Sequence, residues 1–236
     1  MMSRSQPRTI LFFVAAILGA IFFSSAGTEA ATFNVPARYP TIQAAIDAAS
    51  DGDSVLVAPG AYTETITVFN KGITIESSAG PGSTVIEAAK SGSNVVTFMN
   101  LNGKSCGIEG FTFRNSGSFR ALPISVSSSS PTINGNVFDG TNSAWNYGAI
   151  EVDEISPVIA NNIFLNVGDD NSPGGVVTVI CGSSPKIFNN LFVNNRCTAI
   201  MMNLWEGSTP SDYQQYTCRE YGWHFIIPYR FSHSFG

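Results

Sequence analysis

The chain has 236 residues, enough for one sizeable domain, and only 12% of them are charged. The formal net charge is −5 and Lys and Arg form no cluster, which excludes the basic surface of a nucleic-acid-binding protein. Hydrophobic residues make up 44% of the chain, which excludes general disorder.

The N-terminus has the order of residues that is typical of a secretory signal peptide. Arg4 and Arg8 precede an apolar run over residues 10–23, and small residues follow it. Cleavage could follow Ala26 or Ala30. The run is about 14 residues long, whereas a membrane-spanning helix needs roughly 20. We therefore expect a secreted, periplasmic or cell-surface protein with no membrane span after signal removal; an uncleaved anchor is the alternative.

A short amphipathic helix is expected over residues 41–49. Its apolar residues recur at i, i+3, i+4 and i+7, namely Ile42, Ala45, Ile46 and Ala49. Thr41 can cap the first turn. The first coil of a solenoid exposes its core and its unpaired strand edges, and a helix of this kind laid across that end would cover the core.

The second half of the chain contains a repeated pattern, Ser-Pro-x-Ile-x-x-Asn-x-Phe. Its copies begin at Ser130, Ser156 and Ser184, which are 26 and 28 residues apart. In a worn copy upstream, the Ile, Asn and Phe positions are filled by Ile108, Phe111 and Phe113. A period of this length is typical of stacked structural repeats.

Each repeat is interpreted as one coil of three short strands. The first strand turns its middle residue outward, because strand side chains alternate with period two; the copies of this strand are residues 96–98, 124–126, 150–152, 177–179 and 200–202. Ser-Pro-x-Ile forms the second strand, Asn the corner, and x-Phe the start of the third. No segment is helical enough to connect parallel strands, so we predict an all-β fold, a right-handed parallel β-helix (solenoid) with a short N-terminal capping helix.

The repeated Asn and Phe are assigned to the architecture of the coil. A sharp corner often requires a left-handed backbone, which Asn tolerates better than most residues. Strands stack about 4.8 Å apart, so an asparagine ladder is expected from Asn136, Asn162 and Asn190. A stack of rings inside the coil is expected from Phe138, Phe164 and Phe192.

We divide the chain into a signal peptide (1–30), a parallel β-helix domain (31–202) and an aromatic-rich tail without the repeat (203–236). The tail is either a C-terminal cap or a truncated or frame-shifted continuation. The cysteine spacings match no metal motif, and the sequence leaves open any disulfide pairing among Cys106, Cys181, Cys197 and Cys218.

Chemistry is expected on the outward face of the first strand and in the adjoining loops. The candidate catalytic residues are Glu151, Asp153, Asp169 and Asp170, and the candidate substrate-binding residues are Trp145, Tyr147 and Arg120. Such carboxylates could hydrolyse glycosides or bind Ca²⁺ through their oxygens, and Trp145 could stack on a sugar ring. Alternatively, the acids only close a loop and solubilise a face. No other metal or cofactor is expected.

The segments Tyr39–Ala49 and Gly52–Tyr62 together resemble the N-terminal entry of pectin-lyase-like β-helix proteins. Pectin methylesterases share this opening, as do many exported bacterial β-helix repeat proteins without an assigned activity. With the coils, the resemblance covers residues 32–202 and implies a polysaccharide partner. The catalytic motifs of pectin methylesterases, polygalacturonases and alginate epimerases are absent, apart from the pair Asp169-Asp170, so those active sites do not transfer.

The expected function is therefore that of an exported, monomeric β-helix repeat protein. It would bind polysaccharide or a cell-surface glycan without confirmed catalysis. The alternative is a carbohydrate-active enzyme, a polysaccharide lyase or glycoside hydrolase of the same superfamily. Hydrolysis would require the carboxyl groups of Glu151 and Asp169 to lie within about 10 Å of each other.

Overall fold

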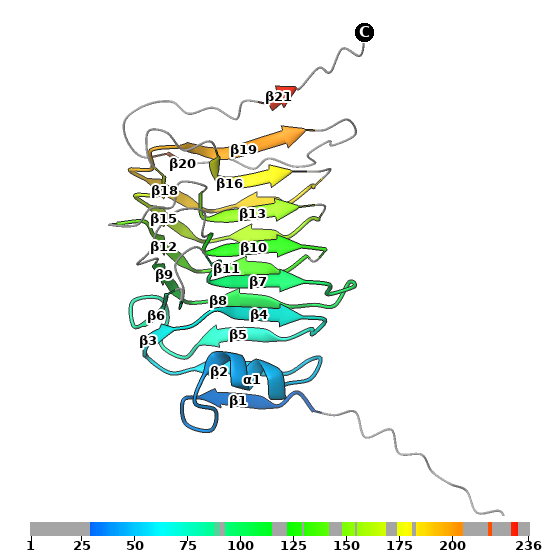
Figure 1. Cartoon of the computed structure of the whole chain (residues 1–236). Helices are drawn as coiled ribbons and strands as arrows, with labels where there is room; N and C mark the ends of the chain where they lie inside the picture. The colour runs from blue at the N-terminus through cyan, green and yellow to red at the C-terminus, as the bar shows by residue number, and fades with distance from the viewer. Residues whose placement is uncertain are drawn as a thin grey trace, which may run out of the picture.

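The computed structural model describes residues 29–87, 89, 93–114, 122–128, 130–141, 148–153, 155–168, 174–180, 183–204, 217–218 and 228–230. Within these residues the chain forms a parallel β-solenoid of about six turns with three sheets along its length (Figure 1). The fold class predicted from the repeat is confirmed. No helix among the described residues is both long enough and apolar enough to cross a membrane.

Each complete coil contributes one strand to each sheet, and neighbouring strands pair in parallel. Sheet A contains β1 (Thr32–Val35), β2 (Ser54–Val57), β5 (Thr74–Ser77), β8 (Gly107–Glu109), β11 (Thr132–Asn134), β14 (Val158–Ala160) and β17 (Lys186–Phe188). Sheet B contains β3 (Gly60–Thr63), β6 (Thr84–Glu87), β9 (Thr112–Arg114), β12 (Val137–Asp139), β15 (Ile163–Leu165), β18 (Leu191–Val193) and β20 (Thr217–Cys218). Sheet C contains β4 (Ile66–Phe69), β7 (Val96–Met99), β10 (Ile124–Ser127), β13 (Ile150–Asp153), β16 (Gly175–Ile180), β19 (Thr198–Leu204) and β21 (Pro228–Arg230).

The asparagine ladder runs through the corner between sheets A and B. Asn162 is 1% exposed, and its Oδ1 accepts hydrogen bonds from the main-chain N–H of Asn136 at 2.9 Å and from Asn136 Nδ2 at 3.3 Å. Its Nδ2 donates to Asn190 Oδ1 at 3.0 Å and to the carbonyl of Ile133 at 2.9 Å. The predicted ladder is confirmed, and each amide satisfies main-chain groups that the corner would leave buried without a partner.

The left-handed backbone at this corner belongs to a different residue from the one predicted. The positive φ angles are those of the residues just before the ladder, 63° at Gly135, 56° at Asn161 and 54° at Asn189. Assigning the turn to the ladder Asn itself was therefore wrong. One residue turns the chain, and the next carries the amide that bonds the neighbouring coils.

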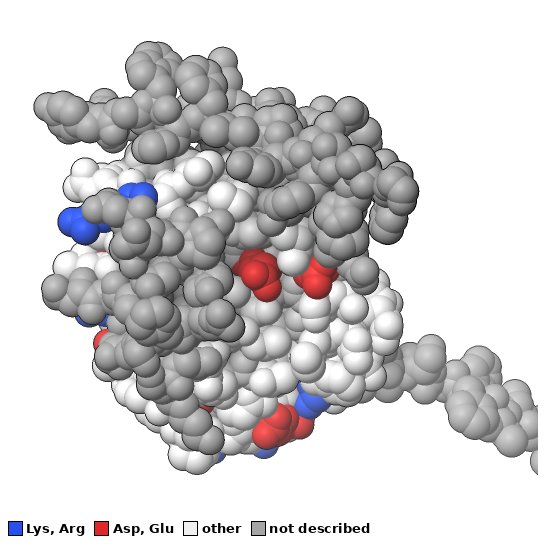
Figure 2. Space-filling model, turned by 45° about the horizontal axis from the view of Figure 1, so that its top comes forward, with Lys and Arg blue, Asp and Glu red and all other residues white. Residues whose placement is uncertain are grey.

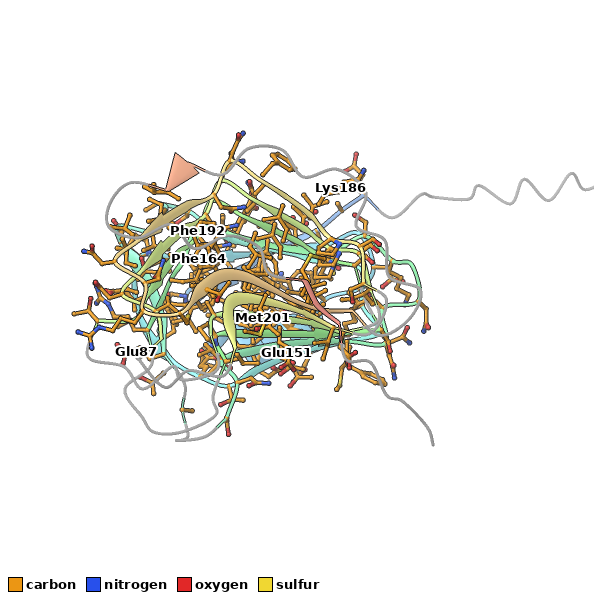
Figure 3. The ribbon with its side chains drawn as sticks, turned by 90° about the horizontal axis from the view of Figure 1, so that it is seen from above. Glu87, Glu151, Phe164, Lys186, Phe192 and Met201 are labelled. Carbon is orange, nitrogen blue, oxygen red and sulfur yellow. The ribbon has the colours of Figure 1, made fainter. Side chains whose placement is uncertain are left out.

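The phenylalanine stack lies inside the solenoid, as the two labelled rings in Figure 3 show. The ring centroids of Phe138 and Phe164 are 4.7 Å apart, and those of Phe164 and Phe192 are 4.9 Å apart. Phe113 extends the stack below Phe138 at 5.1 Å. The predicted stack is confirmed. In the worn copy, buried Phe111 fills the Asn position and can only donate its main-chain N–H to Asn136 Oδ1, so the ladder ends there.

The predicted capping helix is α1 (Ile42–Ala48), which lies across the N-terminal end of the solenoid in Figure 1. Thr41 Oγ1 accepts the N–H of Ala44 at 3.1 Å, which confirms Thr41 as the N-cap. Ile42 and Ile46 are buried in the core beneath the helix.

Gln43 of this helix also closes the open edge of sheet C, a contact that was not predicted from sequence. Gln43 Oε1 accepts the N–H of Thr67 at 2.8 Å, and Gln43 Nε2 donates to the Thr67 carbonyl at 3.2 Å. The Glu64 carboxylate accepts the N–H groups of Ile42 at 3.0 Å and Gln43 at 3.1 Å. The amide of Gln43 thus takes the place of a neighbouring strand on β4.

Two short segments of the tail also join the sheets. Strand β20 pairs with β18, and β21 pairs with β19, which ends at Leu204. Of the cysteines, Cys106 is a buried free thiol whose pKa burial raises to about 12. Cys197 is buried with its Sγ 3.8 Å from the carbonyl of Val167.

Candidate functional site

The outer face of sheet C is built from two columns of outward side chains, which we call the sheet C face. Strand pairing puts Glu151 beside Ser125 on one side and beside Thr178 on the other. The first column consists of Thr67, Thr97, Ser125, Glu151, Thr178 and Met201. The second consists of Phe69, Met99, Ser127, Asp153 and Ile180. The register of the first column is as predicted from Thr97 onward, but Thr178 is only 7% exposed and its hydroxyl group is hydrogen-bonded to Gly175.

The lower end of this face was not predicted from sequence. Thr67 and Phe69 continue the two columns on β4, and Phe69 is 53% exposed. The signal that would have found them is the alternation in Ile66-Thr67-Val68, which matches that of the later coils.

Alternation on β13 fixes the direction of its two acids. Ile150 and Val152 are fully buried in the core, so Glu151 and Asp153 point outward from a rigid strand. Figure 3 shows Glu151 and Met201 on the same side of the coil, away from the enclosed rings. In Figure 2, acidic groups lie in a largely uncharged part of the described surface.

Neither acid on β13 is neutralised by a described partner. Both side chains are half-buried, and neither takes part in an ion pair between described residues. Burial raises the pKa of Glu151, and the negative charge of Asp153 raises it further. Asp153 Oδ1 is buried and accepts no hydrogen bond in the described part of the chain. Two close, poorly compensated carboxyl groups do not stabilise a fold and are typical of functional sites.

We expect Glu151→Gln to stabilise the protein at neutral pH. Ionising Glu151 is harder in the folded than in the unfolded chain, because the folded state raises its pKa. The resulting loss of folding stability is absent below the pKa of Glu151 in the unfolded chain, about 4.3, and is complete above its pKa in the folded chain. Denaturant unfolding should therefore give equal midpoints for variant and wild type near about pH 3, with the variant higher at about pH 7.

The control for this experiment is Ser125→Ala, which changes the neighbouring residue in the same column without removing a titratable group. Its difference from the wild type should not vary over this pH range. A stabilisation by Glu151→Gln that is equally large at about pH 3 and about pH 7 would show that desolvation of this carboxylate is not the cause.

The remaining candidate residues, Asp169, Asp170, Trp145, Tyr147 and Arg120, lie outside the described residues. Their position beside Glu151 and Asp153 stays a prediction, as does the separation of the Glu151 and Asp169 carboxyl groups. Where side chains are described, no three His, Cys, Asp or Glu residues come together as a metal site.

Three parallel sheets, an internal ladder and a helical cap define the class of this molecule as a parallel β-solenoid repeat protein. No protein-family model matches the chain, and no curated protein matches it.

Proposed function

We propose that this is an exported protein of the pectin-lyase-like β-helix type that binds a polysaccharide or cell-surface glycan along the sheet C face. The observation that carries the proposal is the first column, in which the hydroxyl groups of Thr67, Thr97 and Ser125 lie on successive strands below Glu151. Neighbouring groups in this column are one strand spacing apart, about 4.8 Å. A linear polymer with repeated hydroxyl groups can therefore bond to several coils at once, and weak bonds then add up.

The solenoid makes this row suitable for binding because it is rigid before the ligand arrives. The strands behind it are anchored by fully buried residues such as Val96, Ile124 and Ile150. Binding to a fixed row of groups loses less conformational entropy than binding to loops. The low charge of the chain suits a neutral or weakly acidic glycan better than nucleic acid.

A second candidate function is catalysis at the same face, as a polysaccharide lyase or glycoside hydrolase. The observation that favours it is the raised pKa of Glu151 beside Asp153. A carboxyl group that keeps its proton to higher pH can act as a general acid. Residues two apart on a strand are separated by about 7 Å, and inverting glycosidases space their two carboxyl groups by about 6.5–9.5 Å.

Binding can be tested by affinity electrophoresis of the exported protein in gels that contain pectate, alginate or xylan, with and without Ca²⁺. We expect at least one polysaccharide to retard the protein. The double variant Thr97→Ala/Ser125→Ala should bind at least about fivefold more weakly, because each lost hydrogen bond contributes about 0.5–1.5 kcal/mol.

The matched control is Thr74→Ala/Thr132→Ala, which removes two outward hydroxyl groups from sheet A instead. It should bind like the wild type. Equal losses in both double variants, or no retardation by any polysaccharide, would contradict the proposed binding face. The same mixtures are assayed for new reducing ends and for unsaturated products; turnover that Glu151→Gln abolishes would establish the second candidate function.

A further inference from the structure

Pairing with the rest of the fold begins at Ala31. Its carbonyl accepts the N–H of Ser54 at 2.9 Å, one residue before β1 begins. Its own N–H donates to Asp53 Oδ1 at 2.8 Å. Ala31 is exposed, like Glu29 and Ala30 before it, so these two hydrogen bonds are what fix its main chain. Asp53 is thus the side chain that receives the first anchored nitrogen of the solenoid.

The Asp53 carboxylate has no cationic partner among the described residues of the full-length chain. The side chain is 9% exposed, and Oδ2 accepts the N–H of Ser50 at 2.7 Å. The hydrogen bonds from Ser50 and Ala31 lower the pKa of Asp53, so it is a carboxylate at neutral pH. Neither ion pair between described side chains includes it. An ammonium group adds to such hydrogen bonds a Coulombic attraction that a neutral main-chain N–H lacks.

We propose that the chain is cut between Ala30 and Ala31 during export, and that Asp53 then binds the new α-ammonium group of Ala31. The inference rests on the proposed export. In the cut, a signal peptidase of the host adds water across the peptide bond. The carbonyl carbon of Ala30 takes the hydroxyl group and becomes a carboxylate, while the nitrogen of Ala31 keeps its electron pair and takes up protons to become an ammonium.

The sequence on the N-terminal side of this bond suits such a peptidase. Ala30 would be the last residue removed, with Thr28 two positions before it, and both are small. Cleavage after Ala26 would instead leave residues 27–30 attached to Ala31. The α-ammonium would then be four residues away from the nitrogen that Asp53 binds, and Asp53 would keep only neutral donors from the main chain.

The first experiment expresses the full chain in a bacterial host with a secretion pathway and determines the N-terminal sequence of the exported protein. We expect it to begin Ala31-Thr32-Phe33. Exported protein that begins at Gly27 or at another residue would overturn this inference and leave the proposed export standing. An uncut chain that stays in the cytoplasm would overturn both.

The second experiment measures the contact with Asp53 by thermal unfolding. The chain that begins at Ala31 is compared with one that begins at Gly27, at about pH 7 and about pH 10. An unfolded α-amino group has a pKa of about 7.7–8.0, and binding to a carboxylate raises it. The added stability is therefore complete below about pH 8 and disappears as the pH rises past the folded pKa.

We expect the shorter chain to have the higher unfolding temperature at about pH 7, and the two temperatures to converge at about pH 10. With Asp53→Asn in both chains, the difference at the lower pH should be lost. Equal unfolding temperatures at the lower pH, or a difference that Asp53→Asn leaves intact, would overturn the assignment of Asp53.

Discussion

Asn162→Ala is expected to lower the free energy of unfolding by about 4 kcal/mol, because each buried polar group left without a partner costs about 1–3 kcal/mol. The substitution deprives the main-chain N–H of Asn136 and the carbonyl of Ile133 of their partners in the ladder. It also removes the side-chain donor of residue 162 from Asn190 Oδ1, which keeps only the main-chain N–H of residue 162 from that coil. These groups lie at a corner where the residues themselves are buried, so water cannot replace the lost bonds cheaply.

The measurement is equilibrium unfolding in urea or guanidinium chloride, and Asn161→Gly is the matched control. Asn161 is the neighbouring residue, it is exposed, and its φ is 56°, which glycine adopts without strain. We expect this change to shift stability by no more than about 0.5 kcal/mol. Equal losses in both variants would mean that the ladder amides have no special role.

The second large effect is expected from Phe164→Ala, which should destabilise the protein by about 3–5 kcal/mol through loss of apolar contact and formation of a cavity. Phe164 is fully buried and stacks on Phe138 below and Phe192 above. Removing its ring interrupts the stack in the middle. A solenoid transmits stability only between neighbouring coils, so the coils on either side should lose support together.

Phe69→Ala is the control for this substitution, because the same ring is removed from a side chain that is 53% exposed. Its effect on the midpoint of unfolding should be less than about 1 kcal/mol. Combining Phe164→Ala with Phe138→Ala should cost less than the two single effects together, since the rings share one contact. Strict additivity would argue against a continuous stack.

The core of this fold could be predicted because the coils bury the same kinds of residue at equivalent positions. Ile133, Ile159 and Ile187 occupy equivalent positions on neighbouring strands, and all three are buried. Period-two alternation decides which side of a short strand is buried, and the repeat shows where each strand lies. The ladder and the stack follow from the same register, which is why their members could be named from sequence.

The capping helix could be predicted from its own periodicity, but the hydrogen bonds that attach it to the first coil could not. Gln43 contacts Thr67 and Glu64 contacts the start of α1 only because of how the helix lies on the first coil. These contacts occur once and leave no repeated pattern. The sequence also did not show which asparagine of each Asn-Asn pair has the left-handed backbone. A turn residue such as Asn161 and a ladder residue such as Asn162 have the same side chain.

The candidate site was predictable where it lies on a strand and not where it lies in a loop. Glu151 and Asp153 follow the alternation of β13, and the structure turns both outward as expected. Loop residues such as Trp145 and Asp169 belong to connections of unequal length, so the register of the coils does not fix their positions. Their part in the proposed site therefore stays a prediction.

The central claim is that the repeated residues build the solenoid while the sheet C face binds a glycan. The most direct measurement is a crystal structure of the exported protein with an oligosaccharide of the polysaccharide that retards it. We predict sugar rings that run along β7, β10 and β13, with hydroxyl groups bonded to Thr97, Ser125 and Glu151. An oligosaccharide bound only to sheet A or sheet B, with the sheet C face empty, would contradict the claim.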